Sequence, residues 1–255
     1  MPSLSCSSPA FVKAVAACFL ARGAKVLLGD SPAFGSALQV LKKQGFVRAL
    51  SGLDIVFTEF RTGVAQKLDC GLSVTVAAEA LDCDYFVNLP RIKAHEQMGV
   101  TMAVKNVFGV ILGARKAWLH MRHGDTHHGF AEMILDLYKI LPPAMVVADG
   151  IEVMNKRGPV KGSPLLLGCL AVAENFVALD RAMLAVLELE KKRIPLAVAA
   201  DKQGLPGAVM QDISFPALSP ASFAGSGFRA PQNLNPIRFQ ILQYVRSSIR
   251  RVVSG

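Results

Sequence analysis

The chain has few cysteines and no long apolar segment. It contains five cysteines and no CxxC pair: Cys6, Cys18, Cys70, Cys83 and Cys169. An odd, sparse set of this kind excludes a disulfide-stapled miniprotein and argues against an intrinsic zinc or iron–sulfur site. The longest apolar run, residues 165–173, is about half of the ~20 residues that a membrane span needs. We therefore expect a cytoplasmic protein with reduced thiols and no transmembrane segment.

Several common ligand-binding motifs are also missing. There is no GxxxxGK[ST] phosphate loop and no HExxH pair, and GDSP at residues 29–32 stands where a GxGxxG loop would follow the first expected strand. The common nucleotide-loop and zinc-peptidase signatures therefore do not account for this chain. The N-terminus lacks the basic start of a signal peptide, and Lys13 interrupts its apolar stretch, so we expect a helix of the folded domain there.

Acidic residues are absent after Asp212, although Lys and Arg exceed Asp and Glu by 28 to 19 and give a net charge of +9. Residues 236–253 combine arginines with apolar residues at helical spacing, which predicts a docked C-terminal helix with a basic face. An anionic membrane surface, a protein partner or nucleic acid are alternative targets of that face. Because no nucleic-acid-binding motif accompanies it, we expect no nucleic-acid partner.

The apolar pattern that is present predicts an α/β fold. With 52% hydrophobic residues in 255, the chain can form one large domain with or without an extension. Helices are expected at 9–22, 32–45, 129–141 and 175–190, strands at 25–29, 54–58, 84–89, 144–148 and 165–172, and residues 73–81 fit either. This alternation predicts a mostly parallel sheet with helices on both faces, a Rossmann-like three-layer arrangement. We expect one domain over residues 1–200 and a loop-rich extension over 201–255, with a possible strand at 209–215 and the basic C-terminal helix.

Polar residues follow three of the expected strands. Asp30 and Ser31 end the first strand, Asn88 precedes a loop to His95, and Asp149 with Gly150 ends a later strand. In doubly wound sheets, ligands bind beyond the carboxyl ends of the strands. If the sheet is parallel, these three ends lie along one edge and form one site.

All five histidines lie between residues 95 and 128, which directs attention to the middle of the chain. Lys93 and His95 are two residues apart in a loop entered through Pro90, so their side chains point the same way in extended backbone. A cation and an imidazole aimed together can hold a carboxylate or phosphate and transfer a proton. The alternative is two solvated surface residues.

Residues 101–110 are expected to form a helix. Thr101, Lys105 and Gly109 are spaced by four and would share one face of it. A lysine beside a glycine on such a face indicates close approach of an anion or of another backbone, and Asn106 would either cap the helix or bind polar ligand atoms. The alternative for Lys105 is a side chain that reaches solvent from the edge of the helix.

Two further stretches supply candidate ligand residues. Lys116 and His120 are four residues apart, so they would lie on one face of a helix. Imidazoles at such positions could bind a metal, although no acidic residue stands at the spacing of a known metal-binding motif. The segment 149–162 follows a strand, and there Asp149 would bind a hydroxyl or orient a base while Gly158 and Gly162 would let a ligand approach the backbone.

Together these motifs resemble the bacterial and archaeal family called domain of unknown function 362. The resemblance rests on Asn88, Lys93, His95, Lys105, Asn106, Gly109, Lys116, His120, Asp149, Gly158 and Gly162, with supporting matches at residues 23–32 and 178–180. It covers roughly residues 8–190 and implies a possible ferredoxin-like iron–sulfur partner. It also implies a further strand segment before residue 8, which we expect to be missing here, and Arg91 stands where lysine is usual.

The leading hypothesis is an enzyme that binds a small anionic substrate or cofactor. Lys93 and Lys116 would bind the anion together with Asn88, Thr101, Asn106, Gly109, Asp149, Gly158 and Gly162, and the catalytic residues would be His95, His120 and Lys105. A looser similarity to the nickel-pincer lactate racemase family implies a metal or nickel-type cofactor, for which His95 and His120 are the candidate ligands. The alternatives are a redox-linked accessory protein that docks an iron–sulfur partner and a non-catalytic, degenerate binding module.

Overall fold

The computed structural model describes residues 4–32, 35–113, 115–116, 118–119, 127–159 and 161–234. The helices are α1 (Pro9–Leu20), α2 (Ala37–Lys43), α3 (Phe46–Ala49), α4 (Ala78–Leu81), α5 (Ala103–Asn106), α7 (His127–Lys139), α8 (Phe176–Val186) and α9 (Pro195–Lys202). The strands are β1 (Val26–Asp30), β2 (Ile55–Glu59), β3 (Gly63–Lys67), β4 (Ser73–Ala77), β5 (Phe86–Asn88), β6 (Arg91–His95), β7 (Gly99–Thr101), β8 (Ala144–Asn155) and β9 (Ser163–Ala173). Short 3-10 segments lie at Val107–Val110, Lys191–Arg193, Met210–Asp212 and Pro220–Phe223.

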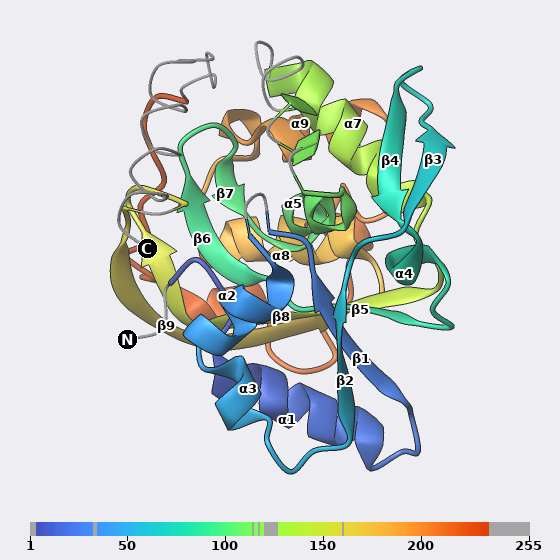
Figure 1. Cartoon of the computed structure of the whole chain (residues 1–255). Coiled ribbons are helices and arrows are strands. Elements are labelled where there is room, and N and C mark those ends of the chain that lie inside the picture. Colours follow the sequence, from blue (N-terminus) through green and yellow to red (C-terminus); the bar gives the residue numbers. More distant parts are fainter. Residues whose placement is uncertain are drawn as a thin grey trace.

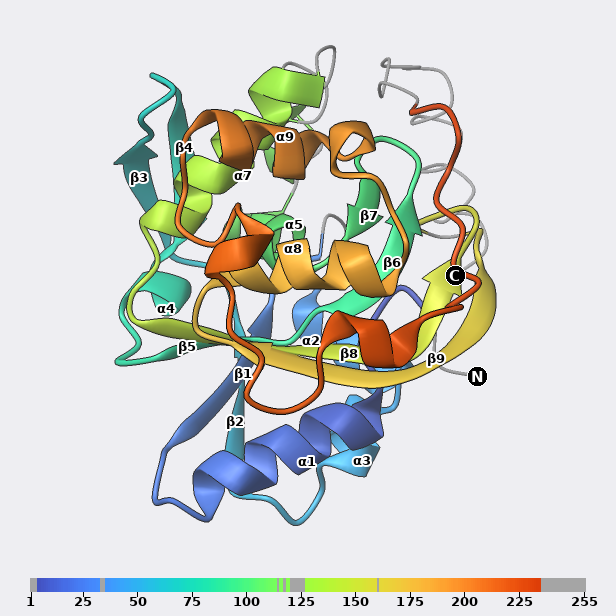
Figure 2. The ribbon, with the colours of Figure 1, turned by 180° about the vertical axis from the view of Figure 1, so that it is seen from behind.

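Strand β8 is the centre of the main sheet. It pairs in parallel with β5 and β6 and antiparallel with β9, and β7 extends the sheet antiparallel to β6. Strands β1 and β2 form a separate parallel pair, and β3 with β4 form an antiparallel pair. Figures 1 and 2 show α1 and α3 on one side of β8, and α8 and α9 on the other. The expected α/β class with helices on both faces of the sheet is therefore confirmed.

The two faces of β8 pack into two different cores. Val146 and Ala148 belong to the large core with α7 and α8, whereas Val147 belongs to a smaller core with Phe11 of α1 and Phe46 of α3. A strand that is covered on both faces needs a continuous apolar run rather than an alternating one. This is why residues 144–148 read as AMVVA, and why β8 joins the N-terminal helices to the rest of the molecule.

Several sequence expectations about local structure are wrong. Residues 91–95, expected in a loop, form β6, because hydrogen bonds to β8 and β7 are available on both sides of it. Thr101 ends β7, opposite Lys93, and does not share a helix face with Lys105. Strand β8 continues through Asp149 to Asn155 because β9 pairs with it over most of its length.

Residues after 200 pack against the large core of the α/β domain. Helix α9 spans residue 200, and Ala208 and Phe228 are buried in the large core. The possible strand at 209–215 is wrong, since this stretch contains only a 3-10 turn at Met210–Asp212. The expected helix at 236–253 lies outside the described residues, and the division of the chain at residue 200 stays a prediction. Within the described residues, no helix has the length and apolar character needed to cross a membrane.

Candidate functional site

A cleft of about 750 Å³ lies between the β1–β2 pair with α1 on one side and β5, β6 and the region of α5 on the other. Four of the residues predicted for the site line it: Asn88, Lys93, Asn106 and Gly109. Asp30, at the carboxyl end of β1, also lines it. Two of the three polar strand ends noted in the sequence therefore meet here, since β1 and β5 both end at this cleft. The third, at Asp149, does not, because β8 continues beyond it.

Two asparagines fix α5 to the end of β5. The Asn88 side-chain amide donates to the carbonyl of Ala103 over 2.9 Å, and its Oδ1 accepts a 2.8 Å hydrogen bond from Nδ2 of Asn106. Asn88 is buried, and satisfied buried amides specify geometry more than they add stability. The pair holds the helix that carries Lys105 at a fixed position beside the cleft.

Lys93 extends from β6 into the cleft. Its Nζ donates a 2.7 Å hydrogen bond to the carbonyl of Ser5, from the N-terminal segment that precedes α1. Burial lowers the pKa of Lys93, and Arg91 acts in the same direction, while Cys6 and Asp30 oppose the shift. A lysine ammonium has three N–H groups, so one bond to Ser5 leaves capacity for a ligand.

Lys105 is held between two aromatic rings. Its Nζ lies 4.6 Å from the ring centroid of Phe108 and 5.3 Å from that of Phe130, and the two rings meet edge to face. Burial, with smaller contributions from the charges of Lys93 and Lys116, lowers the pKa of Lys105 to about 7. A substantial fraction of Lys105 is therefore a neutral amine near pH 7.

Lys116 approaches the same place from a third part of the chain. Its Nζ donates to the carbonyl of Ser31, whose hydroxyl accepts from the backbone N–H of Gly113. Burial lowers the pKa of Lys116 to about 8, although the nearby Asp30 carboxylate raises it. We call Lys93, Lys105 and Lys116 the lysine cluster. In the described residues, none of the three forms an ion pair with a carboxylate, and Asp30 is the acid whose charge acts on Lys93 and Lys116.

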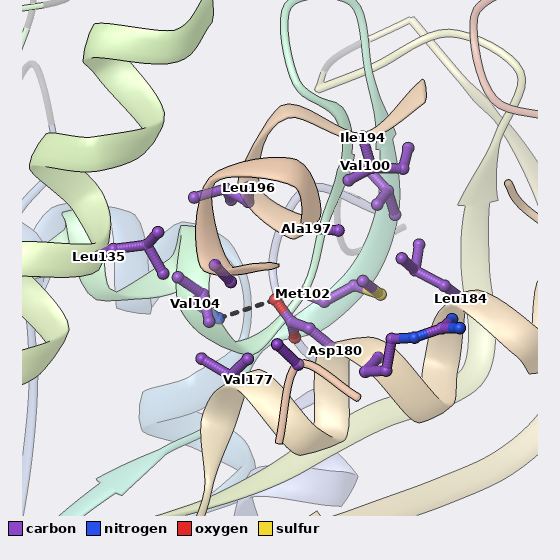
Figure 3. Close-up of a pocket in the computed structure, with 13 residues that line it drawn as sticks. Val100, Met102, Val104, Leu135, Val177, Asp180, Leu184, Ile194, Leu196 and Ala197 are labelled. Carbon is purple, nitrogen blue, oxygen red and sulfur yellow. Dashed lines mark hydrogen bonds between the residues drawn. The ribbon is translucent and has the colours of Figure 1, made fainter. Parts of the chain in front are cut away.

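Asp180 caps the helix that carries Lys105. Its carboxylate accepts hydrogen bonds from the backbone N–H groups of Ala103 (2.7 Å) and Val104 (3.2 Å). Figure 3 shows Asp180 reaching from α8 towards Val104 among apolar side chains such as Leu135, Val177 and Leu196. The cavity there is only about 20 Å³, room for about one water. Burial raises the pKa of Asp180 to about 7, although the two backbone hydrogen bonds oppose the rise.

The sequence analysis did not select Asp180 as a site residue. A signal for it was present, because Asp180 is three or four residues from Val177, Met183 and Leu184, all of which face the core. A carboxylate on the apolar face of an amphipathic helix needs a buried partner. Here the partner is the N-terminus of α5.

His95 is buried at the end of β6 and accepts rather than donates at Nδ1. The backbone N–H groups of Gln97 and Met98 both donate to this nitrogen over 3.2 Å. With Nδ1 accepting these bonds, a neutral ring carries its proton on Nε2. Lys93 and His95 both lie in β6, two residues apart, but His95 does not line the cleft. Its catalytic role stays a prediction.

Asp149 forms an internal tie between elements. Its carboxylate is fully buried, lies 3.4 Å from Nε of Arg91, and accepts from the backbone N–H of Ser8 at the start of α1. Asp149 does not line the cleft. Burial of the Cys169 thiol, with a smaller contribution from the charge of Asp149, raises the pKa of Cys169 to about 11. These contacts connect α1, β6 and β8.

Gly158 and Gly162 lie in the turn between β8 and β9, away from the cleft. A Cβ at Gly158 would lie 1.8 Å from the carbonyl oxygen of Ala94, and one at Gly162 would lie 2.2 Å from the side chain of Met154. The backbone of Gly158 also accepts from Glu96. Both glycines are therefore needed for close packing of this turn on β6 and β8, and their role in ligand binding stays a prediction.

The remaining predicted residues are Thr101 and His120. Thr101 is buried and its hydroxyl has no hydrogen-bond partner in the described part of the chain. His120 lies outside the described residues. Among the residues that are described, no group of three or more His, Cys, Asp or Glu side chains could hold a metal ion, so the predicted metal site stays a prediction.

The fold and cleft define an α/β protein with a buried lysine cluster beside the carboxyl ends of β1 and β5. The chain belongs to the family described as domain of unknown function (DUF362), whose model matches residues 2–185. The resemblance deduced from the motifs is confirmed.

One curated protein is similar over nearly the whole chain. The thylakoid-associated protein sll1697 of Synechocystis sp. is 36% identical over 251 residues, which covers 98% of this chain and 78% of that protein. No solved structure matches the chain significantly.

Proposed function

We propose that this protein binds a small anionic ligand at the lysine cluster and acts on it as an enzyme. The observation that carries the proposal is the burial of Lys93, Lys105 and Lys116 together, from three separate parts of the chain. Among the described residues, Asp30 is the carboxylate that offsets their charge, and Cys6 also acts on Lys93. Taking an ammonium group out of water is unfavourable unless an opposite charge accompanies it. A bound carboxylate or phosphate would supply that charge.

The position of the cluster supports the same proposal. Lys93 lines the cleft at the carboxyl ends of β1 and β5, where open α/β sheets bind their ligands. Lys105 and Lys116 do not line it, but Lys105 is next to Asn106, which does, and Lys116 donates to Ser31, next to the lining residue Asp30. The cleft volume of about 750 Å³ is in the range of small-molecule sites. Asn88 and Asn106 offer amide groups at the same wall. Lys105, partly neutral near pH 7, can take up and return a proton there.

Thermal unfolding in the presence of anions tests binding. Inorganic phosphate and lactate, each compared with chloride at equal ionic strength, should raise the melting temperature of the wild-type chain. At a hundredfold excess over Kd the expected stabilisation is about 2.7 kcal/mol. Lys93→Met should lose most of this response, whereas Lys67→Met, on the exposed β3 strand, should keep it. An equal response of all three chains to anions would contradict the proposal.

The family resemblance supports a second use of the same basic residues, docking of an acidic ferredoxin-like iron–sulfur partner. This candidate predicts retention of a ferredoxin on the immobilised chain at low salt and no turnover by the chain alone. Anion binding without turnover and without a partner would favour a non-catalytic binding module instead.

For the location, we propose a cytoplasmic chain that associates with a membrane only at its surface. The name of the thylakoid-associated relative and the arginines of residues 236–253 support attraction to anionic lipid. Fractionation tests this: the chain should leave the membrane fraction in high salt, whereas retention after a salt wash would contradict it.

A further inference from the structure

The reactive atom of the lysine cluster can be identified from its surroundings. Lys105 lies on α5, whose position is fixed at one end by Asp180 and at the other by the Asn106–Asn88 hydrogen bond. Its Nζ contacts the faces of Phe108 and Phe130 and makes no hydrogen bond or ion pair to another described residue. Lys93 and Lys116 differ, because each donates to a backbone carbonyl.

We propose that Lys105 is a nucleophile that forms an imine with the carbonyl carbon of a 2-oxo acid, whose carboxylate is held by Lys93 and Lys116. The inference rests on the proposed function and names its ligand class. A lysine that is desolvated and placed beside other cations is the arrangement that makes an amine nucleophilic at neutral pH. The two neighbouring ammonium groups have the charge that the carboxylate of such a ligand requires.

The chemistry balances without a further reactant. The neutral Nζ adds to the ligand carbonyl, forming a C–N bond while the carbonyl oxygen takes up the proton that the nitrogen releases. The C–O bond then breaks, and the hydroxyl leaves as water with the second proton of the nitrogen, whose electron pair completes the C=N bond; amine and ketone thus give imine and one water. The burial that lowers the pKa of Lys105 to about 7 supplies the neutral amine. The groups that act on it are Lys93 and Lys116, with the rings of Phe108 and Phe130 in contact.

Access to the amine is narrow. The Lys105 side chain is 7% exposed, and its neighbour Asn106 lines the cleft together with Gly109. A Cβ added at Gly109 would meet only ordinary van der Waals contact among the described residues, with Asp30 Oδ1 at 3.9 Å. A three-carbon oxo acid is small enough to suit such an approach, so pyruvate is the first probe.

The experiment is reductive trapping. The full chain is incubated with pyruvate and sodium cyanoborohydride, which reduces an imine to a stable secondary amine, and the digested protein is mapped by mass spectrometry. The expected result is one ligand on the peptide that contains Lys105, in excess over exposed lysines outside the cleft such as Lys43 and Lys67. Lys105→Arg should abolish this adduct, whereas Lys67→Arg should leave it unchanged.

A pH series gives an internal check that does not depend on any variant. Between pH 6 and pH 8 the neutral fraction of an amine with a pKa near 7 rises roughly tenfold and then levels off, whereas that of an ordinary lysine keeps rising to pH 10. Labelling of Lys105 relative to the exposed Lys43 in the same digest should therefore be highest at pH 6, about half as high at pH 7, and roughly tenfold lower for each pH unit above pH 8.

The outcomes separate this inference from the proposed function. An adduct absent from Lys105, or spread evenly over surface lysines, while phosphate and pyruvate still raise the melting temperature, would overturn the imine and leave anion binding intact. Absence of both the adduct and the thermal shift would overturn both.

Discussion

At the scale of single residues, the candidate site consists of side chains whose charged forms are disfavoured by burial. Lys105 and Asp180 both have a pKa of about 7, one lowered and the other raised. They are joined through α5, because Asp180 binds the first N–H groups of the helix that carries Lys105. Groups of this kind reduce stability, and they are typical of functional sites.

Replacing Lys105 with methionine should stabilise the protein. The folded pKa of about 7 lies below that of a free lysine, so the unfolded chain binds more protons between about pH 7 and 10.5 and stability rises with pH in that window. Lys105→Met should thus gain about 2 kcal/mol at pH 6, with the gain disappearing towards pH 10. Urea unfolding at several pH values measures this. Lys67→Met is the control, and a gain independent of pH would contradict the prediction.

Asp180→Asn should change how stability depends on pH below pH 7, whereas Lys105→Met acts above it. The folded pKa of about 7 lies above the usual 3.8, so the folded state binds more protons between about pH 4 and 7 and wild-type stability falls as pH rises there. Asparagine cannot ionise, so the melting temperature of Asp180→Asn relative to wild type should increase from pH 5 to pH 8. For the control Asp212→Asn, at an exposed position, the difference in melting temperature from wild type should stay the same from pH 5 to pH 8. A constant difference for Asp180→Asn as well would exclude the role of Asp180 as a buried carboxyl group with a raised pKa.

At the scale of elements, local sequence patterns predicted most helices and strands, but not where β-pairing extends them. The apolar run at 144–148 predicts the start of β8, whereas its continuation to Asn155 depends on β9, which is adjacent only in the folded chain. Residues 91–95 show the same limit, since Arg91 and Lys93 pair with β8 some 60 residues away. Strand formation in these polar segments depends on a partner edge, and periodicity contains no information about that edge.

Gly158→Ala should destabilise the β8–β9 turn severely. Its Cβ would lie 1.8 Å from the Ala94 carbonyl oxygen, and backbone atoms cannot move away as a flexible side chain would. We expect a loss of about 3 kcal/mol in the free energy of unfolding. Gly109→Ala, with its nearest contact at 3.9 Å, should change stability little. Equal melting temperatures for the two variants would show that the turn is not packed in this way.

At the scale of the whole molecule, β8 makes the two cores interdependent. Val146 and Ala148 face the large core and Val147 faces the smaller one, while Asp149 connects α1, β6 and β8 through Ser8 and Arg91. The cleft lies between these two halves, so the position of Lys93 relative to Asp30 depends on how both cores pack.

The chain should therefore unfold in one cooperative transition. Val147→Ala removes two methyl groups in the smaller core and should lower the free energy of unfolding by about 2 kcal/mol. It should also lower the protection of backbone amides from hydrogen exchange in α8 as well as in α1. Hydrogen exchange followed by mass spectrometry on peptides from both helices measures this. Loss of protection confined to α1 would show instead that the N-terminal helices open independently.

The sequence by itself determined the α/β class, the family, most elements and the candidate lysines, because these depend on local periodicity and on motif residues that are adjacent or nearly so. Four of the candidate residues that it indicated, Asn88, Lys93, Asn106 and Gly109, line one cleft, and their role in ligand binding stays a prediction. Only the tertiary structure decided that Lys105 and Lys116 are buried with Lys93, that Asp180 caps α5, and that Asp149, Gly158 and Gly162 lie away from the cleft. Burial and long-range pairing set those pKa values and packing contacts, and both arise from segments that meet only on folding.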